Sequence, residues 1–396
     1  MKKIQWGILI AFCVFTGCFM PLVPGVTIDE PDANHTGTYN ITYPGLDVFV
    51  NGTDNTTTEP IGPITAPAPY VISPSELPLI IDGNFVSQHG NSFILGGDWT
   101  APSNVVHGIR IKAPDVVLDG NNHRITGTNT NMSQYPTGVY VVKARYDYGE
   151  NATVKNIQVD GWYDGVDFYS QTKGRIENVH ATNNLVGIDL QNSSNIVVIH
   201  NLLTANSRSG LSTFSGSKNN LIIGNTATGN KGGIGIDSND NTIVDNIATD
   251  NTDLGILVFT SGTNNTVENN QVLRNAIDGI EIWSDDNRIV RNIVRYNKGG
   301  IYLDGASNNL VSENEVTDNS GVGIATFNAG TKPTRYNIIS DNNVTGMGGS
   351  GTQSSTQNIG IFLVEGTSNT IRGNNITGNN GGIYFESSPD NIIYRE

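Results

Sequence analysis

A glycine followed by an apolar residue recurs at nearly even intervals from residue 108 onward. Most neighbouring members of this series lie 21 to 24 residues apart. A period of this length is typical of a solenoid, in which each repeat forms one coil and packs on its neighbours. The series consists of Gly108, Gly138, Gly165, Gly187, Gly210, Gly233, Gly255, Gly279, Gly300, Gly323, Gly360 and Gly382.

Between these glycines asparagines recur at every fifth position, as in Asn241, Asn246 and Asn251, with apolar residues between them. Asparagine tolerates the left-handed conformation of tight turns, which predicts a corner at each of these positions. Stacked coils lie about 4.8 Å apart, so equivalent amides can hydrogen-bond along the stack while residues such as Ile243 and Val267 fill the interior. The glycine and asparagine content and the missing 3.6-residue period exclude a helical solenoid. We therefore predict an all-β parallel β-helix of about 12 coils with asparagine ladders.

The N-terminal part has a different composition. Lys2 and Lys3 precede an apolar run to Val26, which predicts an export signal or anchor over residues 1–26. The residues before Cys18 resemble a lipobox, so lipid anchoring and simple cleavage both stay open. Residues 27–76 are rich in Thr, Asn and Pro and predict a disordered linker with sequons at Asn34, Asn40, Asn51 and Asn55. The β-helix is expected over residues 77–396.

The charge balance narrows the classes of partner. The chain has 22 Lys and Arg against 37 Asp and Glu, for a net charge of −15. This acidity excludes a nucleic-acid binder that works by phosphate neutralisation. Both cysteines, Cys13 and Cys18, lie in the predicted signal, so the body of the protein has no disulfide.

The laddered coil, with Gly108-Ile109-Arg110-Ile111 and the run from Val116 to Gly127, resembles the right-handed parallel β-helix superfamily with its pectate-lyase-like fold. More narrowly it resembles the NosD-like, carbohydrate-binding and sugar-hydrolase repeat proteins of prokaryotic surfaces. The resemblance implies the fold but not one function, because this fold hosts binders, lyases, hydrolases and epimerases. The Asp-Pro-His signature of alginate epimerases is absent. A NosD-like copper role is not expected, because His180 and His200 fall in different columns and the methionines lie apart.

Two columns of each coil should point outward, because side chains alternate along a strand. One column consists of the residues two positions after each glycine, and the other of the residues four positions after it. Together they combine aromatic rings with acids and amides. Rings cover the apolar faces of sugars and polar groups bind their hydroxyls, so this strip predicts polysaccharide binding. Packing of the rings against loops or a neighbouring chain is the alternative. The expected carbohydrate-binding residues are Tyr169, Phe214, Asp237, Phe259, Glu281, Trp283, Tyr302, Asp304 and Tyr384. Tyr135 and the pair Trp162-Tyr163 lie in or near insertions that could wall the groove.

Asp167 and Asp189 occupy the same outward column on adjacent coils, and Asp164 lies just before the first. Carboxylates about 5 Å apart can act as acid and base, or can hold calcium, the one cofactor these residues suggest. Solvated surface acids are the simpler alternative.

These observations predict an exported cell-surface protein whose main role is non-catalytic polysaccharide binding or adhesion. A polysaccharide lyase or hydrolase that uses Asp167 and Asp189 is the second hypothesis, and a structural envelope protein is the third. The expected partner is a polysaccharide or cell-envelope glycan, with membrane contact only through the N-terminal segment.

Overall fold

The computed structural model describes residues 40–43, 46–49, 68–129, 131–143, 150–214, 216–328, 332–346 and 359–394. The chain divides into two units, Met1–Ala66 and Pro67–Glu396. The predicted export signal, both cysteines and the sequons at Asn34, Asn51 and Asn55 lie outside the described residues. None of the helices described is long and apolar enough to span a membrane.

In the first unit, two strands occur in the segment that we expected to be a linker. Strand β1 (Asn40–Tyr43) pairs antiparallel with β2 (Leu46–Phe49), with Asn40 opposite Phe49. The linker prediction did not anticipate this pairing.

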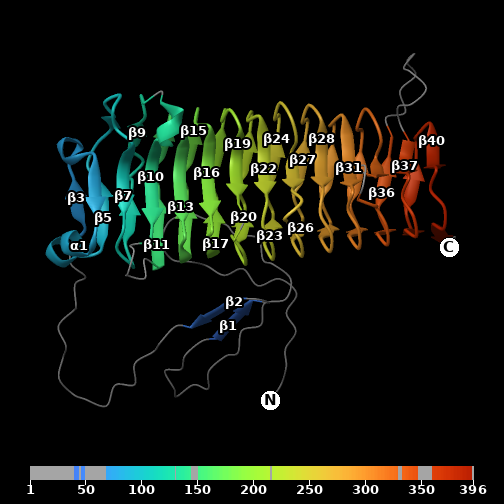
Figure 1. Ribbon diagram of the computed structural model, residues 1–396, viewed down its shortest axis with the longest axis horizontal. Helices are drawn as coiled ribbons and strands as arrows, with labels where there is room; N and C mark the ends of the chain where they lie inside the picture. Colours follow the sequence, from blue (N-terminus) through green and yellow to red (C-terminus); the bar gives the residue numbers. More distant parts are fainter. Residues whose placement is uncertain are drawn as a thin grey trace, which may run out of the picture. The chain divides into compact units, whose positions relative to one another are not determined.

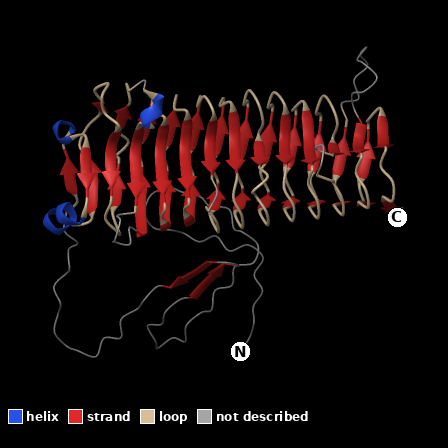
Figure 2. Cartoon of the chain, in the orientation of Figure 1, coloured by secondary structure: helices blue, strands red, loops and turns tan. Residues whose placement is uncertain are grey.

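The second unit is a parallel β-helix, as predicted, with three parallel sheets (Figures 1 and 2). Among the described residues the sheets contain 13, 14 and 12 strands. The 14-stranded sheet runs from β3 (Tyr70–Ile72) to β41 (Ile392–Tyr394), and the 12-stranded sheet from β6 (Trp99–Thr100) to β39 (Asn375–Thr377). The 13-stranded sheet carries the candidate site. Its strands are β4 (Leu79–Ile81), β7 (His107–Ile111), β10 (Thr137–Val142), β13 (Asp164–Tyr169), β16 (Val186–Gln191), β19 (Ser209–Thr213), β22 (Gly232–Ile236), β25 (Ile256–Val258), β28 (Asp278–Ile282), β31 (Gly299–Asp304), β34 (Ile324–Phe327), β37 (Ile359–Val364) and β40 (Gly381–Glu386).

The β-helix begins earlier than the boundary predicted at residue 77. Strand β3 pairs in parallel with β5 (Ser92–Leu95) and so belongs to the first coil. Helix α1 (Gly83–His89) lies at this end, where the Phe85 ring packs 5.5 Å from Tyr70 and 5.6 Å from Phe93. Short strands hidden in a Pro- and Thr-rich segment explain why the sequence pattern missed this start.

Apolar residues of all three sheets point inward and form one continuous core. The predicted interior column is confirmed, because Ile243 pairs with Ile222 on one side and with Val267 on the other, and all three are fully buried. Burial of these side chains is the main stabilising term, since each contributes about 1.5–3 kcal/mol relative to an exposed position.

The asparagine ladders are also confirmed. The backbone N–H of Asn225 donates to Oδ1 of Asn246 at 2.9 Å, and the Asn225 amide donates to the same oxygen and to the Val198 carbonyl. The ladder asparagines do not themselves adopt the left-handed conformation, however. That conformation belongs to the residue before each of them, such as Asp245 at φ 56° and Asn269 at φ 55°.

The repeated glycines serve close packing between coils. A Cβ at Gly255 would lie 2.3 Å from Cγ1 of Val272 and 2.6 Å from the carbonyl oxygen of Gly279 on the next coil. Such distances leave no room for a side chain. The 22-residue glycine period therefore records the stacking of the coils and not a left-handed turn.

Candidate functional site

The outward column predicted from the glycine spacing is a register column of the 13-stranded sheet. Successive members are Cα partners in neighbouring strands: Tyr140, Asp167, Asp189, Ser212, Gly235, Leu257, Glu281, Tyr302, Ala325, Phe362 and Tyr384. The order is as predicted, but uniform exposure is not observed. Asp167, Asp189 and Ala325 are buried, while Tyr384 is 53% exposed.

Three aspartates come together on adjacent strands of this face. Asp164 and Asp167 lie on β13, and Asp189 lies on β16 as the register partner of Asp167. All three line one open cavity of about 570 Å³. They are 2%, 5% and 3% exposed, which excludes the interpretation of Asp167 and Asp189 as solvated surface acids. We call these three residues the carboxyl cluster.

The hydrogen bonding of the carboxyl cluster is incomplete. Oδ1 of each aspartate is buried and has no hydrogen-bond partner among the described residues. Within the described part of the chain, Asp189 alone accepts a side-chain hydrogen bond, from Nε2 of Gln191 at 2.8 Å. Buried polar atoms without protein partners are uncommon in folded proteins, so these three oxygens mark the cavity as a candidate site.

Burial also changes the protonation of the carboxyl cluster. Burial first, and then the charge of Asp189, raises the pKa of Asp164 and of Asp167 well above the usual range. Burial raises the pKa of Asp189 to about 7, although the Gln191 hydrogen bond and Arg208 oppose this rise. Like charges in a shared site cannot all ionise together, so near neutral pH the cluster holds protons and negative charge at once.

Cationic and aromatic groups surround the cluster. The His107 ring stacks on Tyr140 with centroids 4.7 Å apart, and the Arg110 guanidinium lies 5.4 Å from the centroid of the same tyrosine. Burial and then Arg110 lower the pKa of His107 to about 4, so this imidazole is neutral at physiological pH. Arg208 lines the cavity on the other side. These groups could bind sugar hydroxyls or a developing charge.

Tyr163 and Trp162, two neighbouring aromatic residues expected near the groove, lie in different environments. Tyr163 lines the cavity, and its ring meets Tyr135 edge-on at 5.0 Å, as expected for a groove wall. Trp162 is only 1% exposed and donates from Nε1 to the Ile125 carbonyl at 3.1 Å. Its proposed place in the groove wall is wrong, because alternation along the chain turns it into the core.

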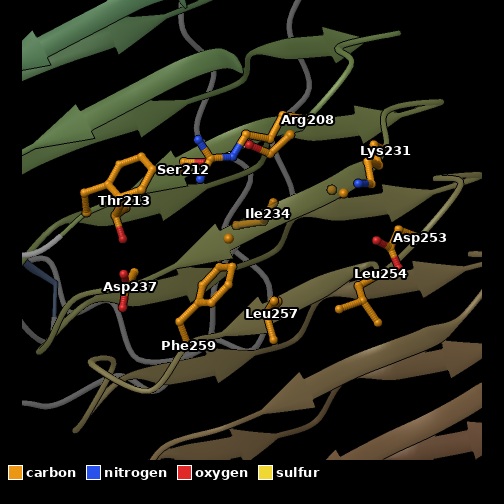
Figure 3. A pocket seen from close by; sticks show the side chains of 15 residues that line it. Arg208, Ser212, Thr213, Lys231, Ile234, Asp237, Asp253, Leu254, Leu257 and Phe259 are labelled. Atoms are coloured by element: carbon orange, nitrogen blue, oxygen red, sulfur yellow. The ribbon is translucent and has the colours of Figure 1, made fainter. Parts of the chain in front are cut away.

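The predicted carbohydrate-binding residues form three groups along this face. Tyr169 and Phe214 line the cavity of the carboxyl cluster. Phe214 also lines a second cavity of about 220 Å³ with Asp237 and Phe259 (Figure 3). The remaining residues lie toward the C-terminal coils: Glu281, Trp283, Tyr302, Asp304 and Tyr384.

Further acidic side chains lie in and beside the third group. Nε1 of Trp283 donates to Glu281 at 2.8 Å, and its ring meets Phe259 edge-on at 5.5 Å. Asp278, three residues before Glu281, is 7% exposed, and burial followed by the charge of Glu281 raises its pKa to about 7. Burial likewise raises the pKa of Asp304.

Sequence reasoning missed Asp278, His107 and Arg208. A usable signal existed for Asp278, because Asp278-Gly-Ile-Glu281 repeats the pattern Asp164-Gly-Val-Asp167. His107 and Arg208 lie immediately before or at the first residue of their strands, outside the two columns that we followed.

No metal site emerges from the described part of the chain. No group of three or more His, Cys, Asp or Glu side chains there is arranged to hold a metal ion. The calcium site that we expected at Asp164, Asp167 and Asp189 is therefore not found among the described residues.

Comparison with solved structures supports the fold. The A-module of mannuronan C-5 epimerase AlgE4 from Azotobacter vinelandii matches with a TM-score of 0.62 and 15% identity, over 82% of this chain and 100% of that one. A mutant of the periplasmic alginate epimerase AlgG matches with a TM-score of 0.51 and 16% identity, over 76% of each chain. A search of curated proteins finds no match.

A protein-family comparison is more specific. The model described as "Right handed beta helix region" matches residues 137–292 and 278–395, which together make up more than half of the chain. The chain therefore belongs to the right-handed β-helix family.

Proposed function

We propose that this protein binds a polysaccharide along the outer face of the 13-stranded sheet and hydrolyses a glycosidic bond at the carboxyl cluster. The observation that carries the proposal is the burial of Asp164, Asp167 and Asp189 in one open cavity with an unpartnered oxygen on each. General acid–base chemistry requires carboxyls that hold protons near neutral pH.

The surroundings of each carboxyl group suggest its role. Asp189 accepts a hydrogen bond from Gln191, and the charge of Arg208 also favours its ionised form. These two groups favour the carboxylate form at Asp189, and we assign Asp167 as the member of the pair that keeps its proton.

These protonation states assign one role in hydrolysis to each of the two carboxyl groups. Asp167 donates its proton to the glycosidic oxygen as the bond to the sugar breaks. Asp189 bonds to the same sugar carbon, and a water then displaces it and gives a proton back to Asp167, so that one water is consumed for each bond cleaved. When Asp164 is ionised, its charge raises the pKa of Asp167 further and helps that residue to keep its proton.

The type of substrate follows from the aromatic lining and is in line with the two similar structures. Tyr140, Tyr169 and Phe214 line the cavity with rings that can cover sugar faces. The similar structures are named as epimerases of mannuronan and alginate, which are polysaccharides. Epimerisation is not proposed, because the Asp-Pro-His signature is absent. Export by the N-terminal signal would bring the protein to such polymers at the cell surface.

Non-catalytic binding is the second candidate, and one observation favours it. Rings continue beyond the carboxyl cluster, with Tyr302 and Phe327 5.4 Å apart and Phe362 and Tyr384 5.3 Å apart. This run extends further than a single cleavage site needs. An adhesive role would use the whole strip.

The test separates binding from cleavage. The full chain is incubated with a panel of polysaccharides, and each is measured for retention on the protein, for chain length and for new reducing ends. We expect one polymer to be shortened by the wild type and retained but not shortened by Asp167→Asn or Asp189→Asn. Retention without shortening by the wild type would support the binding candidate and reject hydrolysis. Unchanged cleavage by both variants would overturn the site.

A further inference from the structure

The outer face of the 13-stranded sheet has a hollow at Ser212 and Gly235, two neighbouring members of the register column. Their strands β19 and β22 border the second cavity, which has a volume of about 220 Å³. A Cβ at Gly235 would first meet Cε2 of Phe259 at 3.2 Å, and its next neighbours lie 3.9 Å away. The missing side chain thus leaves a hollow that Phe259 borders. We call this hollow the glycine pocket.

The glycine pocket has apolar walls and a polar rim. Figure 3 shows Phe259 and Leu257 on one side and Arg208 on the other, with Asp237 toward one end and Lys231 toward the opposite end. Oδ1 of Asp237 is buried and has no hydrogen-bond partner among the described residues. A ring with one apolar face and several hydroxyls fits such a lining.

Two cations line this rim from adjacent coils. Arg208 and Lys231 immediately precede Ser209 and Gly232, which are Cα partners, so the two residues lie on adjacent coils about 4.8 Å apart. Both are exposed, and neither forms a salt bridge with any described residue. The Arg208 guanidinium lies 5.3 Å from the centroid of the Phe214 ring, and both cations are available to an anionic group on a bound sugar.

The glycine pocket adjoins the carboxyl cluster. Arg208 and Phe214 line both cavities. A chain held in the first cavity would therefore place its next unit in the second.

We propose that the glycine pocket is a sugar subsite of the same polysaccharide, specific for a unit that carries an anionic group. Phe259 covers a face of the sugar ring, Asp237 accepts a hydroxyl hydrogen, and Arg208 and Lys231 bind the anion. This inference rests on the proposed function and narrows its substrate to an acidic glycan. The anion is a uronate carboxylate or a sulfate ester, which share the chemistry that two cations recognise.

The experiment compares matched oligosaccharides. Binding to the full chain is measured by calorimetry for an oligogalacturonate and its methyl ester, and for a sulfated galactan oligomer and its desulfated form. We expect the wild type to prefer the charged member of one pair. The pair that shows this preference identifies the anion. Equal affinity within both pairs would overturn the inference.

Variants then test the residues. Lys231→Ala should weaken binding of the charged oligomer by roughly tenfold, as for loss of one hydrogen bond to a charged group, and leave the neutral one unchanged. Arg288→Ala is the matched control, because Arg288 is exposed on β29 (Arg288–Val290) in the 14-stranded sheet. Equal affinity of the Lys231→Ala protein and the wild type for the charged oligomer would contradict the assignment.

Filling the hollow provides an independent variant. Gly235→Leu should weaken binding of both members of the pair, since Leu257 already occupies the next position of the same column and the fold should accept the change. Unchanged binding by a folded Gly235→Leu protein would show that the pocket is not used. If the wild type and these variants all cleaved a neutral polysaccharide at the same rate, the subsite would be rejected. The proposed role of the carboxyl cluster in hydrolysis would then be retained.

Discussion

Asp167 and Asp189 are register partners on the parallel strands β13 and β16, and both are buried beneath an open cavity on the outer face of the β-helix. Backbone pairing sets their Cα atoms about 4.8 Å apart. The solenoid thus supplies a spacing at which two carboxyls share a site. The same spacing recurs at every coil, and the identity of the side chain decides which coil becomes reactive.

The carboxyl cluster should make stability depend on pH. The pKa of Asp189 is raised from 3.8 to about 7, so between these values the folded protein binds a proton that the unfolded chain has lost. Stability from this group is therefore greatest below pH 4 and falls as pH rises toward 7. Asp189→Asn should raise the free energy of unfolding at pH 7.5, by on the order of a few kcal/mol, and should flatten its decline with pH. Chemical denaturation from pH 4.5 to 7.5 measures both effects. A variant that is as pH-dependent as the wild type would contradict the burial of this charge.

Close packing at the repeated glycines predicts a large effect of one methyl group. Gly255→Ala places a Cβ 2.3 Å from Val272 Cγ1 and should destabilise the protein by about 3 kcal/mol or more, because backbone and side chain cannot both move away. Gly382→Ala, in the same series, meets nothing within 4 Å and should be nearly neutral. Thermal melting of the two variants makes the comparison. Similar melting temperatures would show that coil stacking is not what requires the glycines.

The asparagine ladder should respond to truncation at one coil. Asn246 accepts from the backbone and side chain of Asn225 and donates to the Ile222 carbonyl at 2.8 Å. Asn246→Ala leaves buried backbone groups without partners and should cost about 2–4 kcal/mol of stability. Asn239→Ala is the control, since Asn239 is exposed and accepts a single bond, from the Thr263 N–H. Equal losses in the two variants would mean that the buried ladder contributes no more than a surface contact.

The sequence was sufficient to predict register but not burial. The glycine period fixes which residues of successive coils align, and so the column from Tyr140 to Tyr384 could be predicted. Burial depends on the size of neighbouring side chains on adjacent coils, which the period does not contain. Asp167 and Asp189 were therefore aligned correctly but were not recognised as buried.

The rest of the site lay outside the repeat pattern. His107 lies one residue before Gly108 and Arg208 lies two residues before Gly210, so both fall outside the two outward columns, which follow each glycine. Trp162 shows the opposite error, because its neighbour Tyr163 points into the cavity while Trp162 itself packs in the core. Which side chains of an insertion point outward can be predicted only when the strand register of that insertion is known.

The central claim is that the buried carboxyls perform chemistry on a bound polysaccharide. The most direct measurement is the rate of new reducing ends from the retained polymer, from pH 4 to 9, for the wild type and Asp167→Asn. We predict a bell-shaped profile for the wild type, which falls at high pH as the cluster loses its last proton, and loss of at least a hundredfold in rate for the variant with retention unchanged. Cleavage by Asp167→Asn at the wild-type rate and with the wild-type profile would contradict the account.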